Sequence, residues 1–164
     1  MVNVLFVCLG NICRSPAAEG VFRALVERRG LARRVTADSA GTSGWNLGHP
    51  PDLRAQAEAL RRGIDLSGLR ARQAGPDDFH RFDYLLAMDL RNLEALVGFC
   101  PQGREQRLRL FLDFAPDAGR REVGDPYSLG PEAFRQMFQL IETGARGLLS
   151  HIVRHDLGGE DFGA

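Results

Sequence analysis

The chain has 164 residues, of which 44% are hydrophobic and 26% are charged, a composition typical of one globular domain. Its 21 basic and 21 acidic residues give a formal net charge of zero, which disfavours a protein that binds nucleic acid through surplus positive charge. Every basic residue is an arginine, and this excludes mechanisms that need a Schiff-base lysine or a phosphate-loop lysine.

Nothing in the sequence indicates a membrane or secreted protein. No stretch approaches the roughly 20 apolar residues of a membrane span. The apolar run at residues 2–7 has no positive flank and is too short for the core of a signal peptide. Three cysteines (Cys8, Cys13 and Cys100) are a low and odd number, unlike a disulfide framework. We therefore expect a soluble, cytoplasmic protein with no membrane partner and no nucleic-acid partner.

The first 30 residues predict a strand, a tight loop and a helix. Residues 2–7 are apolar and β-branched, as in a buried parallel strand. A polar turn covers residues 8–14, and Ser15 is then expected to cap a helix that has Pro16 at its first position and ends near Gly30. An anion binds favourably at the N-terminus of such a helix.

Strand and helix patterns alternate through the rest of the chain. Further strands are predicted at residues 35–40, 84–88 and 108–114, and helices at about 52–63, at 90–97 and over the periodic apolar run 134–152. This alternation predicts an α/β fold: a single-domain, open parallel four-stranded sheet with helices on both faces, and a phosphate-binding loop between the first strand and the first helix. We expect the domain to cover residues 1–157 and residues 158–164 to be a frayed tail.

The segment that carries chemistry places Cys8 and Arg14 five residues apart. A cysteine and an arginine at this spacing are common by chance, but here the cysteine ends a buried strand and a helix follows directly. A loop wound around an anion points backbone amides inward, and the helix N-terminus adds the positive end of its dipole. The arginine fork binds two phosphate oxygens at once. These parts predict a site for a phosphoryl dianion.

The same field favours the thiolate form of Cys8, which makes this residue the expected nucleophile. Ser15 is placed to donate a hydrogen bond to its sulfur. Gly10 and Asn11 are the residues best able to adopt a left-handed backbone within the loop.

The run from Val7 to Pro16 resembles the signature loop of the low-molecular-weight protein tyrosine phosphatases. The resemblance covers most of the chain in the family's order and spacing, through Asp38-Ser-Ala-Gly-Thr42, Trp45 with Gly48, Ala71-Arg72, Met88-Asp89 and Asp125-Pro-Tyr127. It implies a four-stranded parallel sheet and hydrolysis of phosphotyrosine through a phosphocysteine intermediate. It also implies a phosphotyrosine protein as substrate, with a tyrosine kinase as a candidate, inorganic phosphate as product, and neither cofactor nor metal.

The resemblance also implies a role for each matching residue. Cys8 would attack phosphorus, and Asp125 would protonate the leaving phenolate and then act as base on water. Trp45 and Tyr127 would form the two walls of the substrate slot, and Ser39 would support the loop. The phosphoryl oxygens would be held by Arg14 and by the loop amides of Leu9, Gly10, Asn11, Ile12, Cys13, Arg14 and Ser15.

The sequence departs from many members of the family at two positions. A histidine that supports the loop asparagine through a serine is replaced here by Leu69, so this support is either weaker or supplied by another group. Ser128 stands where many relatives have a second aromatic residue, which argues against regulation through paired tyrosines.

Alternative interpretations remain for several residues. Cys13 is either a redox partner that protects Cys8 as a disulfide or a small packed side chain. A metal site at Cys8 and Cys13 lacks a second ligand pair, and His151 with His155 fits a solvated helix face better than a metal site. An arsenate reductase would need further cysteines beyond Cys100. A phosphotyrosine-binding module without activity is disfavoured because the nucleophile, the arginine and the acid are all present.

Overall fold

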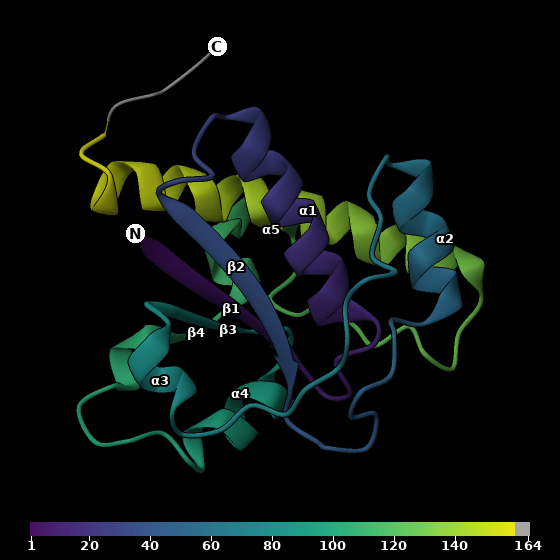
Figure 1. Ribbon diagram of the computed structural model, residues 1–164, viewed down its shortest axis with the longest axis horizontal. Helices are drawn as coiled ribbons and strands as arrows, with labels where there is room; N and C mark the ends of the chain where they lie inside the picture. The colour runs from purple at the N-terminus through teal and green to yellow at the C-terminus, as the bar shows by residue number, and fades with distance from the viewer. Residues whose placement is uncertain (160–164) are drawn as a thin grey trace.

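The computed structural model describes residues 1–159 and contains one four-stranded sheet (Figure 1). Its strands are β1 (Val2–Cys8), β2 (Val35–Gly41), β3 (Tyr84–Ala87) and β4 (Leu108–Leu110), in the order β2-β1-β3-β4. All three neighbouring pairs are parallel, and Val4 of β1 lies opposite both Ala37 and Tyr84. The predicted parallel α/β fold is confirmed.

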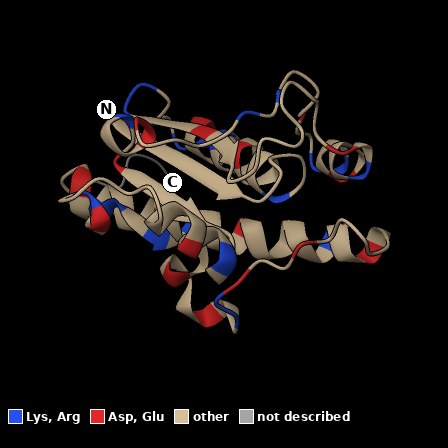
Figure 2. Cartoon of the chain, turned by 90° about the horizontal axis from the view of Figure 1, so that it is seen from below, with Lys and Arg blue, Asp and Glu red and all other residues tan. Residues whose placement is uncertain are grey.

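Helices cover both faces of the sheet. Helices α1 (Arg14–Arg28), α2 (Leu53–Arg61) and α5 (Pro131–Asp156) lie on one side, and α3 (Asp78–Arg81) and α4 (Leu90–Val97) lie on the other (Figure 1). Within residues 1–159, none of the helices combines the length and the apolar character that a membrane span needs. Acidic and basic positions are interspersed over the helices and loops (Figure 2).

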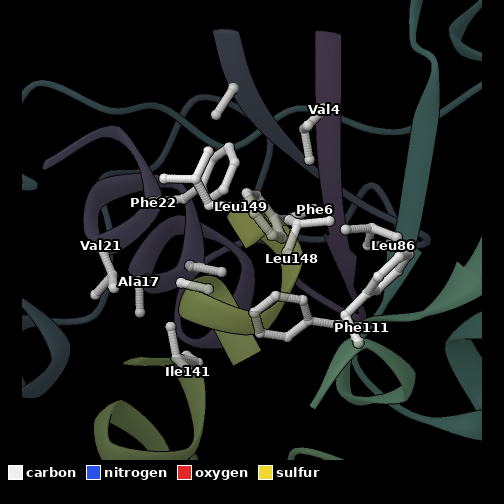
Figure 3. Packing of buried hydrophobic residues seen from close by; sticks show 14 of the residues in the cluster. Val4, Phe6, Ala17, Val21, Phe22, Leu86, Phe111, Ile141, Leu148 and Leu149 are labelled. Atoms are coloured by element: carbon white, nitrogen blue, oxygen red, sulfur yellow. The ribbon is translucent and has the colours of Figure 1, made fainter. Parts of the chain in front are cut away.

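The larger core lies between the sheet and helices α1 and α5. Alternate residues of β1 point into it, and the Phe6 ring meets the Phe22 ring of α1 at 5.6 Å and the Phe111 ring at 5.3 Å, both edge to face (Figure 3). Helix α5 packs closely against the backbone at Phe114, and a Cβ atom at Gly147 would lie only 2.1 Å from the Phe114 carbonyl oxygen. This packing fixes the sheet against α1, the helix that follows the loop after β1.

The predicted strand at 108–114 is wrong in its second half. Only Leu108–Leu110 pairs with β3, and Phe111–Phe114 forms a 3-10 helix. Phe111 and Leu112 are consecutive and both belong to the core on the α1 and α5 side, whereas successive side chains of a strand point to opposite faces. The turn brings Phe111 under α5, so close that a Cβ atom at Gly144 would lie 2.6 Å from its ring.

The start of α1 also differs from the prediction. The helix begins at Arg14, with Cys13 as a cap that makes no side-chain hydrogen bond, so Ser15 lies inside the first turn instead of capping it. Two other predicted helices are confirmed with their own caps: Asp52 accepts from the Arg54 amide at α2, and Asp89 forms a capping box with Asn92 at α4. The four-residue helix α3 was not predicted.

The predicted tail lies outside the described residues from 160 onward. Gly158 and Gly159 have left-handed backbones that close the end of α5, where the Gly159 amide donates to the Val153 carbonyl.

Candidate active site

A pocket of about 220 Å³ opens at the carboxyl ends of the strands. The chain passes from β1 to β2 on one side and later to β3 on the other, so the loop after β1 lies at the switch point where ligands bind in open parallel sheets. The pocket is lined by Cys8, Leu9, Gly10, Ile12, Cys13, Arg14, Trp45, Asn46, Asp125 and Tyr127. It therefore gathers predicted residues from three separate segments of the chain.

The Cys8 sulfur lies at the base of this pocket. It accepts a hydrogen bond from the Asn11 amide at 3.3 Å and lies 3.0 Å from the Ser15 hydroxyl oxygen. Within residues 1–159, no backbone carbonyl accepts from the amides of residues 12–15. These amides stand at the head of α1, where the helix dipole favours negative charge.

Asn11 holds the loop in its curled shape. It is the one described residue other than glycine with a positive φ, 56°. Its side-chain amide donates to the Ser15 hydroxyl at 2.8 Å and to the Ser39 hydroxyl at 3.0 Å, and its side-chain carbonyl accepts from the Arg72 amide at 3.0 Å. The left-handed conformation is thus fixed by three buried or partly buried hydrogen bonds.

Gly10 serves a different purpose from the predicted one. Its φ is not positive; instead, a Cβ atom there would lie 2.6 Å from the Asn46 side-chain nitrogen. That nitrogen donates to the Gly10 carbonyl at 3.1 Å, which ties the loop to the segment that carries Trp45. The glycine permits a close approach, not an unusual backbone angle.

Glu19 stands at the end of the hydrogen-bond chain that begins at the sulfur. The Ser39 hydroxyl donates to its carboxylate at 2.7 Å, and Arg23 pairs with the other carboxylate oxygen at 2.7 Å. Burial raises the pKa of Glu19, whose exposed fraction is 2%, against the lowering effects of Ser39 and Arg23. Leu69, at the position of the missing histidine, packs against the larger core. In this chain the hydrogen-bond chain from the sulfur ends on a carboxyl group of α1.

Arg14 is buried and held from two directions. Its Nη1 atom donates to the Asp89 carboxylate at 2.6 Å and to the Val123 carbonyl at 3.0 Å, and its Nη2 atom lies 3.7 Å from the Asp125 carboxylate. Burial disfavours the charged guanidinium, but Cys8 and the hydrogen bond to Asp89 outweigh it and raise the pKa of Arg14. The guanidinium is therefore a fixed positive charge beside the sulfur.

The opposite border of the pocket is far more exposed. The Asp125 side chain is 45% exposed and accepts from the Tyr127 amide at 3.1 Å. Trp45 and Tyr127 are 78% and 58% exposed. Arg54 secures this border, because it pairs with Asp52 and donates to the carbonyls of Tyr127 and Leu129 at 2.8 and 3.1 Å.

Comparison with known proteins identifies the family. The family profile described as low molecular weight phosphotyrosine protein phosphatase matches residues 3–157. The YfkJ phosphatase of Bacillus subtilis is 43% identical over 152 residues, 93% of this chain and 96% of its own. The human low molecular weight phosphotyrosine protein phosphatase is 42% identical over 148 residues, 90% of this chain and 93% of its own. The chain belongs to this family.

Solved structures agree with this assignment. The crystal structure of YfkJ matches this fold with a TM-score of 0.90 over 95% of this chain and 97% of that one, at 41% identity. Wzb of Vibrio vulnificus, solved in complex with benzylphosphonate, matches with a TM-score of 0.79 over 92% and 98%, at 29% identity. The protein is a cysteine-dependent tyrosine phosphatase that hydrolyses phosphotyrosine in two steps through a phosphocysteine, as its family does.

The phosphatase contains site residues that the sequence analysis did not single out. Asp89 binds Arg14; it appears in the sequence analysis only within the Met88-Asp89 pair, without a role, and its place two residues after β3, the neighbour of β1, was a signal for one. Glu19 and Arg54 act through contacts between distant segments, and no local pattern marks them. Asn46 is recognisable only from its contact with Gly10.

The remaining candidates of the phosphatase lie away from the pocket. Cys100 is half-buried beyond α4. His151 packs against the rings of Tyr84 and Phe114 at 6.0 and 4.9 Å, so it belongs to an aromatic cluster more than to the predicted solvated face. Among residues 1–159, no three histidine, cysteine, aspartate or glutamate side chains are grouped to hold a metal.

Proposed function

We propose that Cys8 is the nucleophile and that Arg14 with the amides of residues 9–15 holds the phosphoryl group. The observation that carries this proposal is the Cys8 sulfur at the head of α1, bonded to the Asn11 amide and in contact with Ser15 beside a fixed arginine. The sulfur attacks phosphorus and the bond from phosphorus to the phenolic oxygen breaks. Preorganised donors stabilise the charge that develops on the equatorial oxygens.

Asp125 is the general acid and then the general base in this proposal. In the first step it gives its proton to the leaving phenolate oxygen. In the second step it takes a proton from the water that attacks the phosphocysteine, and the phosphorus–sulfur bond breaks to release inorganic phosphate and the Cys8 thiolate. Its position 3.7 Å from Arg14 supports this role, because it faces the arginine from the open side of the pocket.

Trp45 and Tyr127 form the walls of the slot for the substrate ring. Both line the pocket, and flat aromatic faces pack well against a phenyl group. The Vibrio vulnificus relative holds benzylphosphonate, an aromatic group joined to a phosphorus acid, which supports an aryl phosphate as the ligand of this chain.

We further propose that the enzyme acts in the cytoplasm on phosphotyrosine proteins, a tyrosine kinase among them. Cys8, Cys13 and Cys100 are all free, and a thiol nucleophile needs a reducing compartment to stay active. Ser39 supports the loop through Asn11, and Cys13 is the candidate redox partner of the nucleophile.

The test compares hydrolysis of p-nitrophenyl phosphate, a phosphotyrosine peptide and a phosphoserine peptide. We expect turnover of the two aryl esters by the wild type, none by Cys8→Ser, and no turnover of phosphoserine. Cys100→Ser is the matched control and should retain wild-type rates. Aryl ester turnover that survives in a folded Cys8→Ser enzyme would remove Cys8 from the nucleophile role.

A further inference from the structure

Exposed apolar side chains gather around the pocket. Ten large apolar side chains of the described chain are exposed, and three of them, Leu9, Trp45 and Tyr127, line the pocket. Leu47 and Leu129 are also exposed and lie two residues after Trp45 and Tyr127, and exposed Leu53 precedes Arg54, which donates to the Tyr127 and Leu129 carbonyls. We call these six the apolar rim: Leu9, Trp45, Leu47, Leu53, Tyr127 and Leu129. Clustered apolar exposure of this kind marks interaction surfaces, whereas single exposed residues do not.

Hydrogen bonds fix the segments of the apolar rim to the catalytic loop. The Ser43 amide donates to the Leu9 carbonyl at 3.0 Å, and the Asp52 amide donates to the Ile12 carbonyl at 2.8 Å. Arg54 then joins the start of α2 to Tyr127 and Leu129 through their carbonyls. The rim is thus a surface with a defined position relative to Cys8, so a bound substrate would meet it on both sides of the phosphotyrosine ring.

The charge around the apolar rim disfavours acidic residues beside the phosphotyrosine. The bordering segments 9–13, 42–53 and 124–130 contain no arginine, and their two acidic residues are Asp52 and Asp125. Arg54 follows Leu53 directly and lies 5.6 Å from the centroid of the Tyr127 ring. Its guanidinium is already paired with Asp52 and bonded to the Tyr127 and Leu129 carbonyls. A carboxylate beside the phosphotyrosine would therefore find no arginine on these segments to pair with.

We infer that the apolar rim binds apolar side chains that flank the phosphotyrosine of a protein substrate. This inference rests on the proposed function, since it concerns the same pocket. The four leucines of the rim cover the flanking residues, while Trp45 and Tyr127 hold the ring itself. The substrate class is therefore a phosphotyrosine with neighbours such as leucine or isoleucine, and acidic neighbours are disfavoured.

The test measures kcat/KM on phosphotyrosine peptides that differ only at the two residues before and the two after the phosphotyrosine. One peptide carries leucine and isoleucine there, one serine, and one aspartate and glutamate. Each rate is divided by that of the same enzyme on p-nitrophenyl phosphate. We expect the apolar peptide to exceed the acidic one by roughly tenfold, the size of effect that partial burial of one or two leucines produces.

Two leucines on the same helix provide the matched variants. Leu53 and Leu60 both belong to α2 and are 79% and 62% exposed, but only Leu53 is in the apolar rim. Leu53→Ser combined with Leu47→Ser should remove most of the preference for the apolar peptide. Leu60→Ser should keep the wild-type preference.

Three results would overturn the inference while leaving the proposed function intact. The first is equal kcat/KM on all three peptides, and the second is a preference for the acidic peptide. The third is a specific activity that falls as enzyme concentration rises and recovers in Leu53→Ser, which would show that the rim binds a second copy of the chain. Loss of all cysteine-dependent aryl phosphatase activity would instead contradict the proposed function.

Discussion

The base and the border of the pocket are built in opposite ways. The base comes from one continuous run, residues 8–15, in which Asn11, Arg14 and Ser15 are buried polar side chains with several hydrogen bonds each. The border comes from separate segments, and its functional side chains are exposed: Asp125, Trp45 and Tyr127. The base can hold one anion in one geometry, whereas the border can be altered without disturbing the fold.

This difference separates stability from specificity within one site. Changes in the base remove buried hydrogen bonds and should affect both the free energy of unfolding and the rate. Changes in the border touch solvent-exposed groups and should affect rate or substrate choice alone. Substitutions in the two regions test this separation.

The largest expected effect is on the rate, from Asp125→Ala in the border. We expect kcat on phosphotyrosine to fall about 10²–10⁴-fold, because the phenolate would leave without its proton. The loss should be much smaller for aryl phosphates whose leaving groups are easily expelled. The free energy of unfolding should change by less than about 0.5 kcal/mol.

The control for that variant is Asp117→Ala, which removes an exposed acid outside the pocket. An equal loss on good and poor leaving groups would take Asp125 out of the acid role. A large drop in unfolding free energy would show that the border is not separable from the fold.

The next effect is on stability, from Asn11→Ala in the base. This change removes the hydrogen bonds that the Asn11 side chain makes with the Ser39 and Ser15 hydroxyls and the Arg72 amide, and it places an alanine at a φ of 56°. We expect a loss of about 3 kcal/mol or more in unfolding free energy, measured by denaturant titration.

Asn11→Gly separates the two causes of that loss. Glycine removes the same hydrogen bonds but accepts the left-handed backbone, so it should recover about 1 kcal/mol relative to alanine. Wild-type stability in both variants would contradict the assignment of Asn11 as the residue that holds the loop.

A smaller effect concerns the pH dependence of the free energy of unfolding, and it comes from Glu19 beneath the base of the pocket. Burial raises the pKa of this carboxyl above its ordinary value of 4.5, with Arg23 and Arg72 opposing the change and Asp38 adding to it. A raised pKa means that the folded state binds the proton more tightly than the unfolded state does. The resulting stabilisation is fully present below pH 4.5 and is lost as the pH rises through the pKa of the folded state. Each tenfold difference in proton affinity between the two states corresponds to about 1.4 kcal/mol.

Glu19→Gln should abolish this pH dependence, because the amide cannot ionise. Wild type should therefore lose stability relative to Glu19→Gln as the pH is raised from 4 towards 8. Glu27→Gln, at an exposed position of the same helix, is the control. A wild-type stability that rises relative to Glu19→Gln over this range would reverse the sign and refute the prediction.

The smallest effect on steady-state rate is expected for Cys13→Ser. Burial, then Asp52 and Cys8, raise the pKa of the Cys13 thiol, so it reacts slowly at neutral pH. In the redox role proposed for Cys13, peroxide converts the Cys8 thiolate to a sulfenic acid, and the Cys13 thiolate then displaces hydroxide from it, released as water once protonated, to form a disulfide. We expect thiol reagents to restore the oxidised wild type more fully than Cys13→Ser, with the difference growing at higher pH.

Cys100→Ser serves as the control in the peroxide experiment. Equal recovery of Cys13→Ser and wild type would mean that Cys13 is only a packed side chain.

The two regions also differ in how far the sequence predicts them. The strand, the loop and the helix around Cys8 follow from a contiguous pattern, and the structure contains all three. The prediction of Ser15 as a cap is wrong because its hydroxyl bonds across the loop, a choice that local propensity does not reveal. The prediction for Gly10 fails for the same reason, since a glycine is needed there to leave room for the side chain of Asn46, 36 residues away.

Tertiary contacts account for the rest of what the sequence could not predict. The run at 108–114 has strand composition, but packing under α5 turns Phe111 inward and ends the strand at Leu110. Arg54 is one of 21 arginines, and only its contacts with Tyr127 and Leu129 distinguish it from a solvated surface residue.

The two bonds of the Arg14 guanidinium have a consequence for the order in which the protein forms. Its partners Asp89 and Val123 lie 75 and 109 residues further along the chain. Contacts of such long sequence separation form late, because the intervening chain must first be ordered. During synthesis, residues 8–15 emerge early but must wait for Val123 before their arginine is held. Catalytic competence is therefore acquired only after most of the polypeptide has been made, and the enzyme can begin to turn over substrate only when its fold is complete.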